Sequence, residues 1–323
     1  MRILFLTQWF HPEPFFKGLP FAKLLQEQGH KVEVLTGFPN YPGGKLYPGY
    51  KVVPFKREVI DGITVNRVPL YPSHDRSGLR RIANYLSFAV SSLLVGPWAI
   101  QKPDVVYVYN LITLVWAATL IRTIYKCKIV YDVQDLWPES VLSSGLLNNR
   151  IALNLLNKWC NWAYSRADKV AVLSPGFKKE LIRRGLLKEN IEIIYNWCDA
   201  SAIQLKINPE YSEKWGLKDT FNVVFAGTMG VMQGMDTVLE SACLCQSVLP
   251  NVRFVLVGGG VEVKRLQAKA KLLDLKNVVF IPLQPMAEMG KIFGVAHALL
   301  VHLKDDPLFK ITIPSKTSNV LCD

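Results

Sequence analysis

The chain has 323 residues, half of them apolar, which is enough for two domains of ordinary size, each with its own core. Residues 1–200 hold 25 Lys and Arg against 15 Asp and Glu, whereas residues 201–323 hold 13 against 11. This balance favours an anionic lipid surface or a phosphate-bearing substrate over nucleic acid, because the basic residues adjoin apolar segments rather than interleaved aromatics, and the six scattered cysteines exclude a zinc site of the usual spacing.

Apolar runs alternate with helical spacing from the first residues onward. A run at 2–7, a Pro-rich loop, helical spacing at 19–28 and a second run at 31–36 predict a strand, a helix and a parallel strand. Further strands are expected at 104–109, 128–132, 169–173 and 191–195. The first half is therefore predicted to be a doubly wound α/β domain. Because no export signal precedes the first run, we expect a cytosolic protein with free thiols.

The pattern then restarts after a polar, Pro-containing segment. Runs at 222–226, 253–257, 278–281 and 298–301 predict a second domain of the same class. The expected organisation is a first domain at 1–199, a linker at 200–220 and a second domain at 221–323.

Twenty residues without a charge lie between Arg81 and Lys102, which is about the length of a membrane span. Gly96 and Pro97 are expected to interrupt this segment, and its Asn and Ser residues lower its hydrophobicity. Three interpretations stay open: a buried helix, a helix lying on an anionic membrane surface, or a true membrane span. The second explains why Arg76, Arg80 and Arg81 cluster just ahead of the segment.

The loop after the first strand holds His11, Glu13, Lys17 and Gly18, where open α/β sheets bind their ligands. The glycine allows close backbone approach, although a turn that needs Gly and Pro for shape alone has the same composition, and the lysine could be simply solvated.

The segment YDVQDLWPES (131–140) places Asp132 and Asp135 at and just beyond a strand end. Carboxylates there can contact sugar hydroxyls or an incoming nucleophile. Asp135 is the candidate for this role, with helix capping as its alternative, while Asp132 is interpreted as structural. Asn110 ends the neighbouring strand.

Two glycine-rich loops follow strands in the second half. In FAGTMGVMQGMD (225–236), Gly227, Gly230 and Gly234 precede a helix whose free amides can hold a diphosphate. In VLVGGGVEVKRL (255–266), Gly258 and Gly259 follow the next strand, and glycines needed only for packing are the alternative interpretation. Leu283 follows the third strand.

A last helix start is expected in LKDDPLFKITIPSKT (303–317). Pro314 would leave the next amides free, so Ser315 and Lys316 are predicted to hold a phosphate.

The opening MRILFLTQWFHPEP (1–14), the segment YDVQDLWPES and the segment SPGFKKELIRRGLLKENIEIIYNWCD (174–199) together resemble the bacterial retaining nucleotide-sugar glycosyltransferases of family 4. Within that family the chain is most similar to the L-fucosamine transferases of O-antigen and capsule assembly. The resemblance implies a GT-B fold, in which two Rossmann-like domains face each other. It also implies transfer of N-acetyl-L-fucosamine from its UDP-linked donor to an undecaprenyl-diphosphate-linked acceptor, without metal or cofactor, at the cytoplasmic face of the plasma membrane.

The resemblance also assigns roles to the candidate residues. It places the loop with Gly18 and the strand end with Asn110 on the acceptor side, and the glycine loops, Leu283 and the segment with Lys316 on the donor side. Family members carry a lysine in the first glycine loop, where this chain has Val231, Met232 and Gln233, so Lys316 is expected to neutralise the diphosphate.

The chain departs from the family pattern near its end. The two glutamates of the family correspond roughly to Ile311 and Asn319, and relatives continue well beyond residue 323, so a truncated second domain is expected. Two other functions stay open: a nucleotide-sugar epimerase of the same fold, and an inactive remnant that binds lipid or partners.

Overall fold

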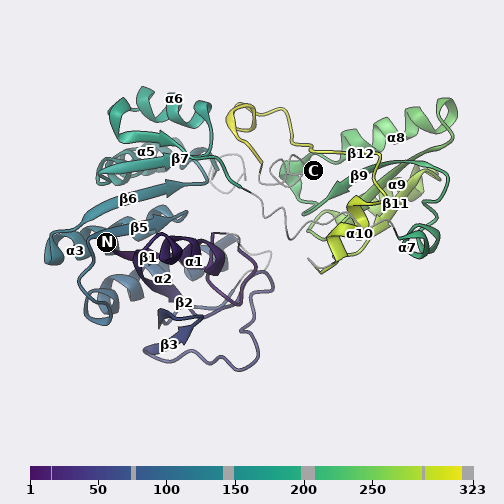
Figure 1. The fold of residues 1–323 in the computed structure, drawn as a ribbon. Coiled ribbons are helices and arrows are strands. Elements are labelled where there is room, and N and C mark those ends of the chain that lie inside the picture. Colours follow the sequence, from purple (N-terminus) through teal and green to yellow (C-terminus); the bar gives the residue numbers. More distant parts are fainter. Residues whose placement is uncertain (16, 74–77, 141–148, 198–207, 286–287, 315–323) are drawn as a thin grey trace. The chain divides into compact units, whose positions relative to one another are not determined.

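The computed structural model describes all 323 residues except 16, 74–77, 141–148, 198–207, 286–287 and 315–323. The chain divides into two compact units, Met1–Tyr195 and Asn196–Asp323 (Figure 1). Each unit is built on a largely or wholly parallel sheet flanked by helices. The prediction of two doubly wound α/β domains is therefore confirmed.

The sheet of the first unit has the strand order β3-β4-β2-β1-β5-β6-β7-β8. All described pairs in it are parallel except β3 with β4. Six of the strands lie where apolar runs predicted them. The strands are β1 (Arg2–Leu6), β2 (Lys31–Gly37), β3 (Lys56–Ile60), β4 (Ile63–Val68), β5 (Val105–Tyr109), β6 (Lys128–Val133), β7 (Lys169–Val172) and β8 (Ile191–Ile193).

The hairpin of β3 and β4 was not predicted. Its two-residue turn is Asp61-Gly62, and both residues have positive φ, 49° and 79°. An Asp-Gly pair between β-rich runs is a strong hairpin signal, because a turn that matches strand twist needs two such residues. The hairpin adds the antiparallel edge to the sheet.

Helices flank both faces of this sheet (Figure 1). Helix α1 (Leu19–Glu27) packs on β2, whereas α2 (Gly78–Ala99) and α3 (Val115–Tyr125) pack against each other and on β4, β2, β5 and β6. The chain moves one way along the sheet from β1 to β2 and the other way from β4 to β5 and β6. Right-handed crossovers therefore place α1 on one face and α2 and α3 on the other.

Helix α2 is continuous where the sequence predicted an interruption. Gly96 and Pro97 do not interrupt it, because the helix continues to Ala99 with Pro97 inside it. Only Trp98 and Ala99 follow the proline in the helix, so the loss of its N–H donor affects a short stretch. The helix is long and apolar enough to cross a membrane, the one such helix among the described residues, yet part of it is buried inside the fold. Helices α5 (Arg150–Ser165) and α6 (Pro175–Arg183) also belong to this unit.

The second unit has a four-stranded parallel sheet in the order β11-β10-β9-β12. Helix α7 lies within the segment expected to be a linker, and Tyr211 and Leu217 belong to the hydrophobic core of this unit. The elements are α7 (Pro209–Lys214), β9 (Phe221–Ala226), α8 (Asp236–Val248), β10 (Val252–Val257), α9 (Val263–Leu272), β11 (Val278–Ile281), α10 (Met289–Phe293) and β12 (Ala298–Leu299).

Candidate substrate sites at the strand ends

In each sheet, one pair of neighbouring strands marks the point where the chain turns from one side to the other. In the first unit these strands are β1 and β5, and in the second they are β9 and β12. Doubly wound sheets bind ligands at the carboxyl ends of such a pair. The loops after these strands are therefore the candidate sites.

Lys17 forms a buried ion pair in the loop after β1. Its Nζ lies 2.5 Å from Oδ2 of Asp132, and both side chains are 1% exposed. Asp132, in β6, also accepts hydrogen bonds from the Tyr107 hydroxyl and from Gln134 Nε2. The alternative interpretation of Lys17 as a solvated side chain is therefore wrong. The pair joins the loop to the strand end, and the structural interpretation of Asp132 agrees with its burial.

The other candidates of this unit lie around that pair. Gly18 is buried at the start of α1, where an added Cβ would lie 2.8 Å from the carbonyl oxygen of Phe15. Asn110 follows β5 in the left-handed region, with φ 68°, and its N–H donates to the carbonyl oxygen of Asp132. Asp135 is accessible to solvent, although crowding by protein atoms raises the pKa of its carboxyl above the ordinary value. The side chain of His11 is exposed.

An aromatic cluster lines the same loops and was not singled out from the sequence. Trp9 stacks on Phe15, with ring centroids 5.1 Å apart, and meets Tyr41 and Tyr85 edge-on at 6.0 and 5.9 Å. These residues come from the loops after β1 and β2 and from α2. The sequence contained a signal for this cluster, because aromatic residues follow both β1 and β2. The carboxyl ends of these parallel strands meet at one edge of the sheet.

Glu13 fastens the loop after β1 to the loop after β2. The carboxylate is 4% exposed and accepts from the backbone N–H groups of Phe10, Asn40 and Tyr41 at 2.8–3.0 Å. Burial raises its pKa to about 7, although these donors and Arg67 act in the opposite direction. Its oxygens hold the loop backbone, so the geometry gives Glu13 a positioning role.

This carboxyl group makes stability depend on pH. Because the folded protein binds the proton more tightly than the unfolded chain, the contribution of Glu13 is largest below pH 4.5 and is lost as the pH rises to about 7. The loss is expected to reach about 3 kcal/mol. Urea unfolding of the wild type and Glu13→Gln across this range checks it; a constant difference in unfolding free energy would contradict the expectation.

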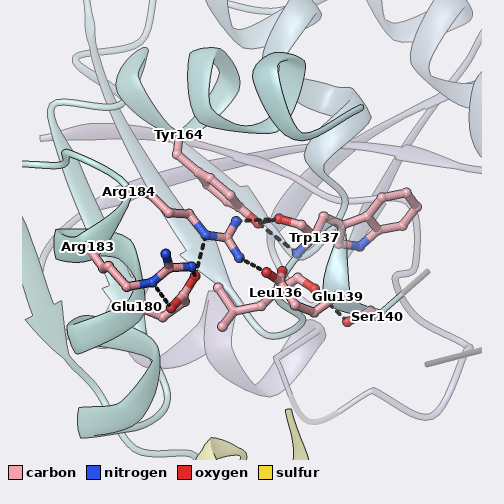
Figure 2. A network of polar contacts seen from close by, with 8 residues as sticks. All are labelled: Leu136, Trp137, Glu139, Ser140, Tyr164, Glu180, Arg183 and Arg184. Atoms are coloured by element: carbon pink, nitrogen blue, oxygen red, sulfur yellow. Dashed lines mark hydrogen bonds and ion pairs between the residues drawn. The ribbon is translucent and has the colours of Figure 1, made fainter. Parts of the chain in front are cut away.

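A polar network holds the segment after β6 in place (Figure 2). Arg184, 4% exposed, forms an ion pair with Glu139, donates from Nη1 to the carbonyl oxygen of Trp137 at 2.7 Å, and donates from Nε to Glu180 at 2.9 Å. The Trp137 N–H donates to the hydroxyl of Tyr164 in α5. The turn that follows Asp135 is thus fixed from α5 and α6.

Replacing Arg184 with Met is expected to destabilise the first unit by about 2–3 kcal/mol, because two carboxylates and a carbonyl lose a shared donor. Arg183→Met is the matched control, since Arg183 pairs with the same Glu180 but its side chain is 73% exposed. Urea unfolding of both variants measures the difference. Equal effects of the two substitutions would argue against the positioning role of Arg184.

In the second unit the two glycine loops are hydrogen-bonded to each other. Gly227 N–H donates to the carbonyl of Val257, and Met229 N–H donates to that of Gly259. A Cβ on Gly258 would lie 2.1 Å from the carbonyl oxygen of Gly227. Close packing of the loops therefore requires Gly258, whereas a Cβ on Gly259 would meet nothing within 4 Å.

A lysine lies beside the first glycine loop, although the loop itself has none. Gly234 has φ 59°, and a Cβ there would lie 2.9 Å from Cγ of Lys304, which follows β12. The Lys304 N–H donates to the carbonyl of Met232, and His302 Nδ1 lies 2.6 Å from the carbonyl oxygen of Gln233. Gly230 N–H donates to the Gln233 side chain. Sequence reasoning missed Lys304 because only the parallel pairing of β12 with β9 brings it here.

Leu283 follows β11 and is 70% exposed. Ser315, Lys316 and Arg76 lie outside the described residues. Among the residues that the structure describes, no group of three or more His, Cys, Asp and Glu side chains could hold a metal ion.

The fold is that of solved glycosyltransferase structures. The chain superposes on Anabaena Alr3699/HepE in complex with UDP and glucose with a TM-score of 0.59 and 19% identity, covering 93% of this chain and 73% of that one. For the E. coli trehalose-6-phosphate structure bound with UDP-2-fluoro glucose, the TM-score is 0.69, the identity 12% and the coverage 94% and 78%. Two successive Rossmann-like units of this kind define the GT-B class.

Family models match both units: Glycosyl transferase 4-like domain over residues 19–197 and Glycosyl transferases group 1 over residues 208–307. The chain belongs to the glycosyl transferase 4-like family. It is 27% identical to the putative colanic acid biosynthesis glycosyl transferase WcaI of Escherichia coli (strain K12), over 92% of this chain and 74% of that protein. It is 26% identical to the probable glycosyltransferase WbjE of Pseudomonas aeruginosa, over 61% and 49%.

Proposed function

We propose that the protein transfers a sugar from a nucleoside-diphosphate donor, with UDP-N-acetyl-L-fucosamine as the best candidate, to a lipid-linked oligosaccharide in O-antigen or capsule synthesis. The observation that carries the donor assignment is the glycine loop after β9, with the start of α8 and Lys304 beside it. Backbone amides at a helix start and a nearby cation suit a diphosphate. Structures of the same fold support this donor class: HepE in complex with UDP and glucose or with UDP-glucose, and the E. coli trehalose-6-phosphate structure bound with UDP-2-fluoro glucose.

The proposed transfer retains the configuration of the sugar and uses no metal. The bond between the anomeric carbon and the diphosphate breaks while the amides and Lys304 stabilise the charge that develops on the leaving oxygen. The acceptor hydroxyl bonds to the same face of that carbon, and the departing diphosphate can take its proton. In the first unit, Asp135 and Asn110 are the proposed contacts of the reacting sugars, with the aromatic cluster beside them.

The first test is calorimetric titration of UDP into the protein, followed by donor screening with a lipid-linked acceptor. Saturable binding and acceptor-dependent release of UDP would support the proposal. Release of UDP and an altered sugar without acceptor would indicate the epimerase instead. Absence of binding by folded protein would favour the inactive remnant that binds lipid or partners.

Lys304→Met is expected to weaken UDP affinity by on the order of tenfold, because a charge-assisted contact to the diphosphate is lost. Lys310→Met is the control, since Lys310 lies in the same segment and pairs with Asp305. Calorimetry measures both variants. An unaltered affinity in Lys304→Met would remove this lysine from the site and leave Lys316 as the candidate.

The proposed location is the cytoplasmic face of the plasma membrane, with the protein peripherally attached. An anionic surface would be met by Arg80 and Arg81 at the start of α2, together with Arg76. The lipid-linked acceptor requires such a location, because its lipid portion stays in the bilayer.

A further inference from the structure

Helix α2 turns an apolar face toward solvent. Every exposed side chain of the helix is apolar apart from Arg80. Five of them follow one side at intervals of four residues, and the last two, Leu94 and Trp98, are 65% and 81% exposed. The five residues are Ile82, Leu86, Val90, Leu94 and Trp98. A helix that borders water normally turns charged residues outward, so this face lacks the usual surface chemistry.

The opposite side of α2 is fixed in the fold. Asn84 is 1% exposed; its Oδ1 accepts from Gln8 Nε2 and its Nδ2 donates to the carbonyl oxygen of Tyr71. Phe88, Ser92 and Gly96 are buried on the same side. The outward face therefore cannot rotate into the core, and crossing a membrane would break these contacts.

Helix α3 continues the apolar face. Trp116, Leu120 and Ile124 are exposed at the same spacing of four residues, and Trp116 is 51% exposed. The Tyr125 hydroxyl donates to the carbonyl of Pro97 at 2.7 Å, which joins the last turns of the two helices. The ring of Trp116 also contacts that of Trp162 in α5. We name the outward residues of α2 and α3 the α2–α3 face.

The positive charge of helices α2, α3 and α5 favours an anionic partner for the α2–α3 face. Segments 78–99, 115–126 and 149–166 contain seven Lys and Arg residues and no Asp or Glu. Arg122 pairs with Asp168, which lies outside these segments, so an excess of cations remains. A second copy of the chain would bring like charges together, whereas an anionic bilayer complements them. Exposed tryptophans beside basic residues also suit the headgroup region.

We infer that the α2–α3 face docks on an anionic phospholipid bilayer, with its apolar side chains in the interfacial region. Tyr85 of α2 contacts Trp9 in the loop after β1, so the face begins beside the candidate acceptor residues. The inference takes its purpose from the proposed lipid-linked acceptor. Its test needs neither donor nor acceptor, so the two proposals can fail separately.

The test is flotation with phosphatidylcholine vesicles that contain or lack about one-third phosphatidylglycerol. Leu94→Glu/Trp98→Glu is expected to lower the partition coefficient on anionic vesicles by on the order of tenfold or more. The matched control is Leu244→Glu/Leu272→Glu, since these residues are 75% and 86% exposed on α8 and α9. Its partitioning should remain close to that of the wild type.

Several results would overturn the inference: no vesicle binding by the wild type, unchanged binding by the α2 variant, or an equal loss in the control. Complete release of the wild type by high salt would assign attachment to the arginines alone. A dimer that becomes a monomer in the α2 variant, measured by light scattering, would identify a second copy as the occupant. If the glutamate variant fails to fold, Leu94→Gln/Trp98→Gln serves the same comparison.

Discussion

Replacing Lys17 with Met should destabilise the first unit by about 3–5 kcal/mol, because Asp132 would stay buried without its cation. The side chains of the pair are both 1% exposed, so water cannot take the place of the ammonium group. The variant should also lose transfer activity, since the loop after β1 would no longer be held against β6. Urea unfolding gives the free energy, and the transfer assay gives the activity.

The chain offers a matched control in a second Lys–Asp pair. Nζ of Lys23 lies 2.9 Å from Oδ2 of Asp61, but the two side chains are 45% and 52% exposed. Lys23→Met should therefore change the unfolding free energy by less than about 1 kcal/mol. The double variant Lys17→Met/Asp132→Asn should recover part of the loss, because it removes the unpaired charge. If Lys17→Met were as mild as Lys23→Met, the pair would have no important role in stability.

Gly258→Ala and Gly260→Ala should have the second large effect, in the second unit. Their added methyl groups would lie 2.1 and 2.2 Å from the carbonyl oxygens of Gly227 and Met229, and both residues have positive φ, 135° and 142°. Overpacking against backbone and an unfavourable conformation together should cost about 3 kcal/mol or more. UDP binding should be lost with the loop geometry.

The control is the residue between them. A Cβ on Gly259 would meet nothing within 4 Å, so Gly259→Ala should keep the unfolding midpoint of the wild type. Calorimetry and urea unfolding of the three variants separate folding from binding. Loss of UDP affinity in Gly259→Ala at unchanged stability would mean that this glycine makes room for the ligand itself.

Much of the fold could be predicted from the sequence, because a parallel strand covered on both faces is a short continuous apolar run. The runs that become β1 and β5 are of this kind. The edge hairpin was missed because β3 alternates exposed and half-buried residues, and its signal is the Asp61-Gly62 turn rather than hydrophobicity. The interruption expected at Gly96 and Pro97 was wrong, because only two residues of the helix follow the proline.

The candidate sites were only partly predictable. Strand ends identified Asp135, Asn110 and the glycine loops, since these positions depend on local pattern and topology. The burial of Lys17 was not predictable, because its partner is 115 residues away along the chain. Lys304 depends in the same way on the pairing of β12 with β9. The outward direction of the apolar side of α2 likewise requires knowledge of what packs beneath the helix.

The hydrogen bonds between the two glycine loops have a consequence for engineering. The Met229 N–H donates to the carbonyl oxygen of Gly259, and the Met229 carbonyl oxygen accepts from the N–H of Glu262. In a chimera that takes only residues 227–234 from a homologue with another donor, the new first loop would have to form its hydrogen bonds with the original second loop. We therefore expect chimeras to accept a new donor sugar only when residues 227–234 and 258–262 are exchanged together.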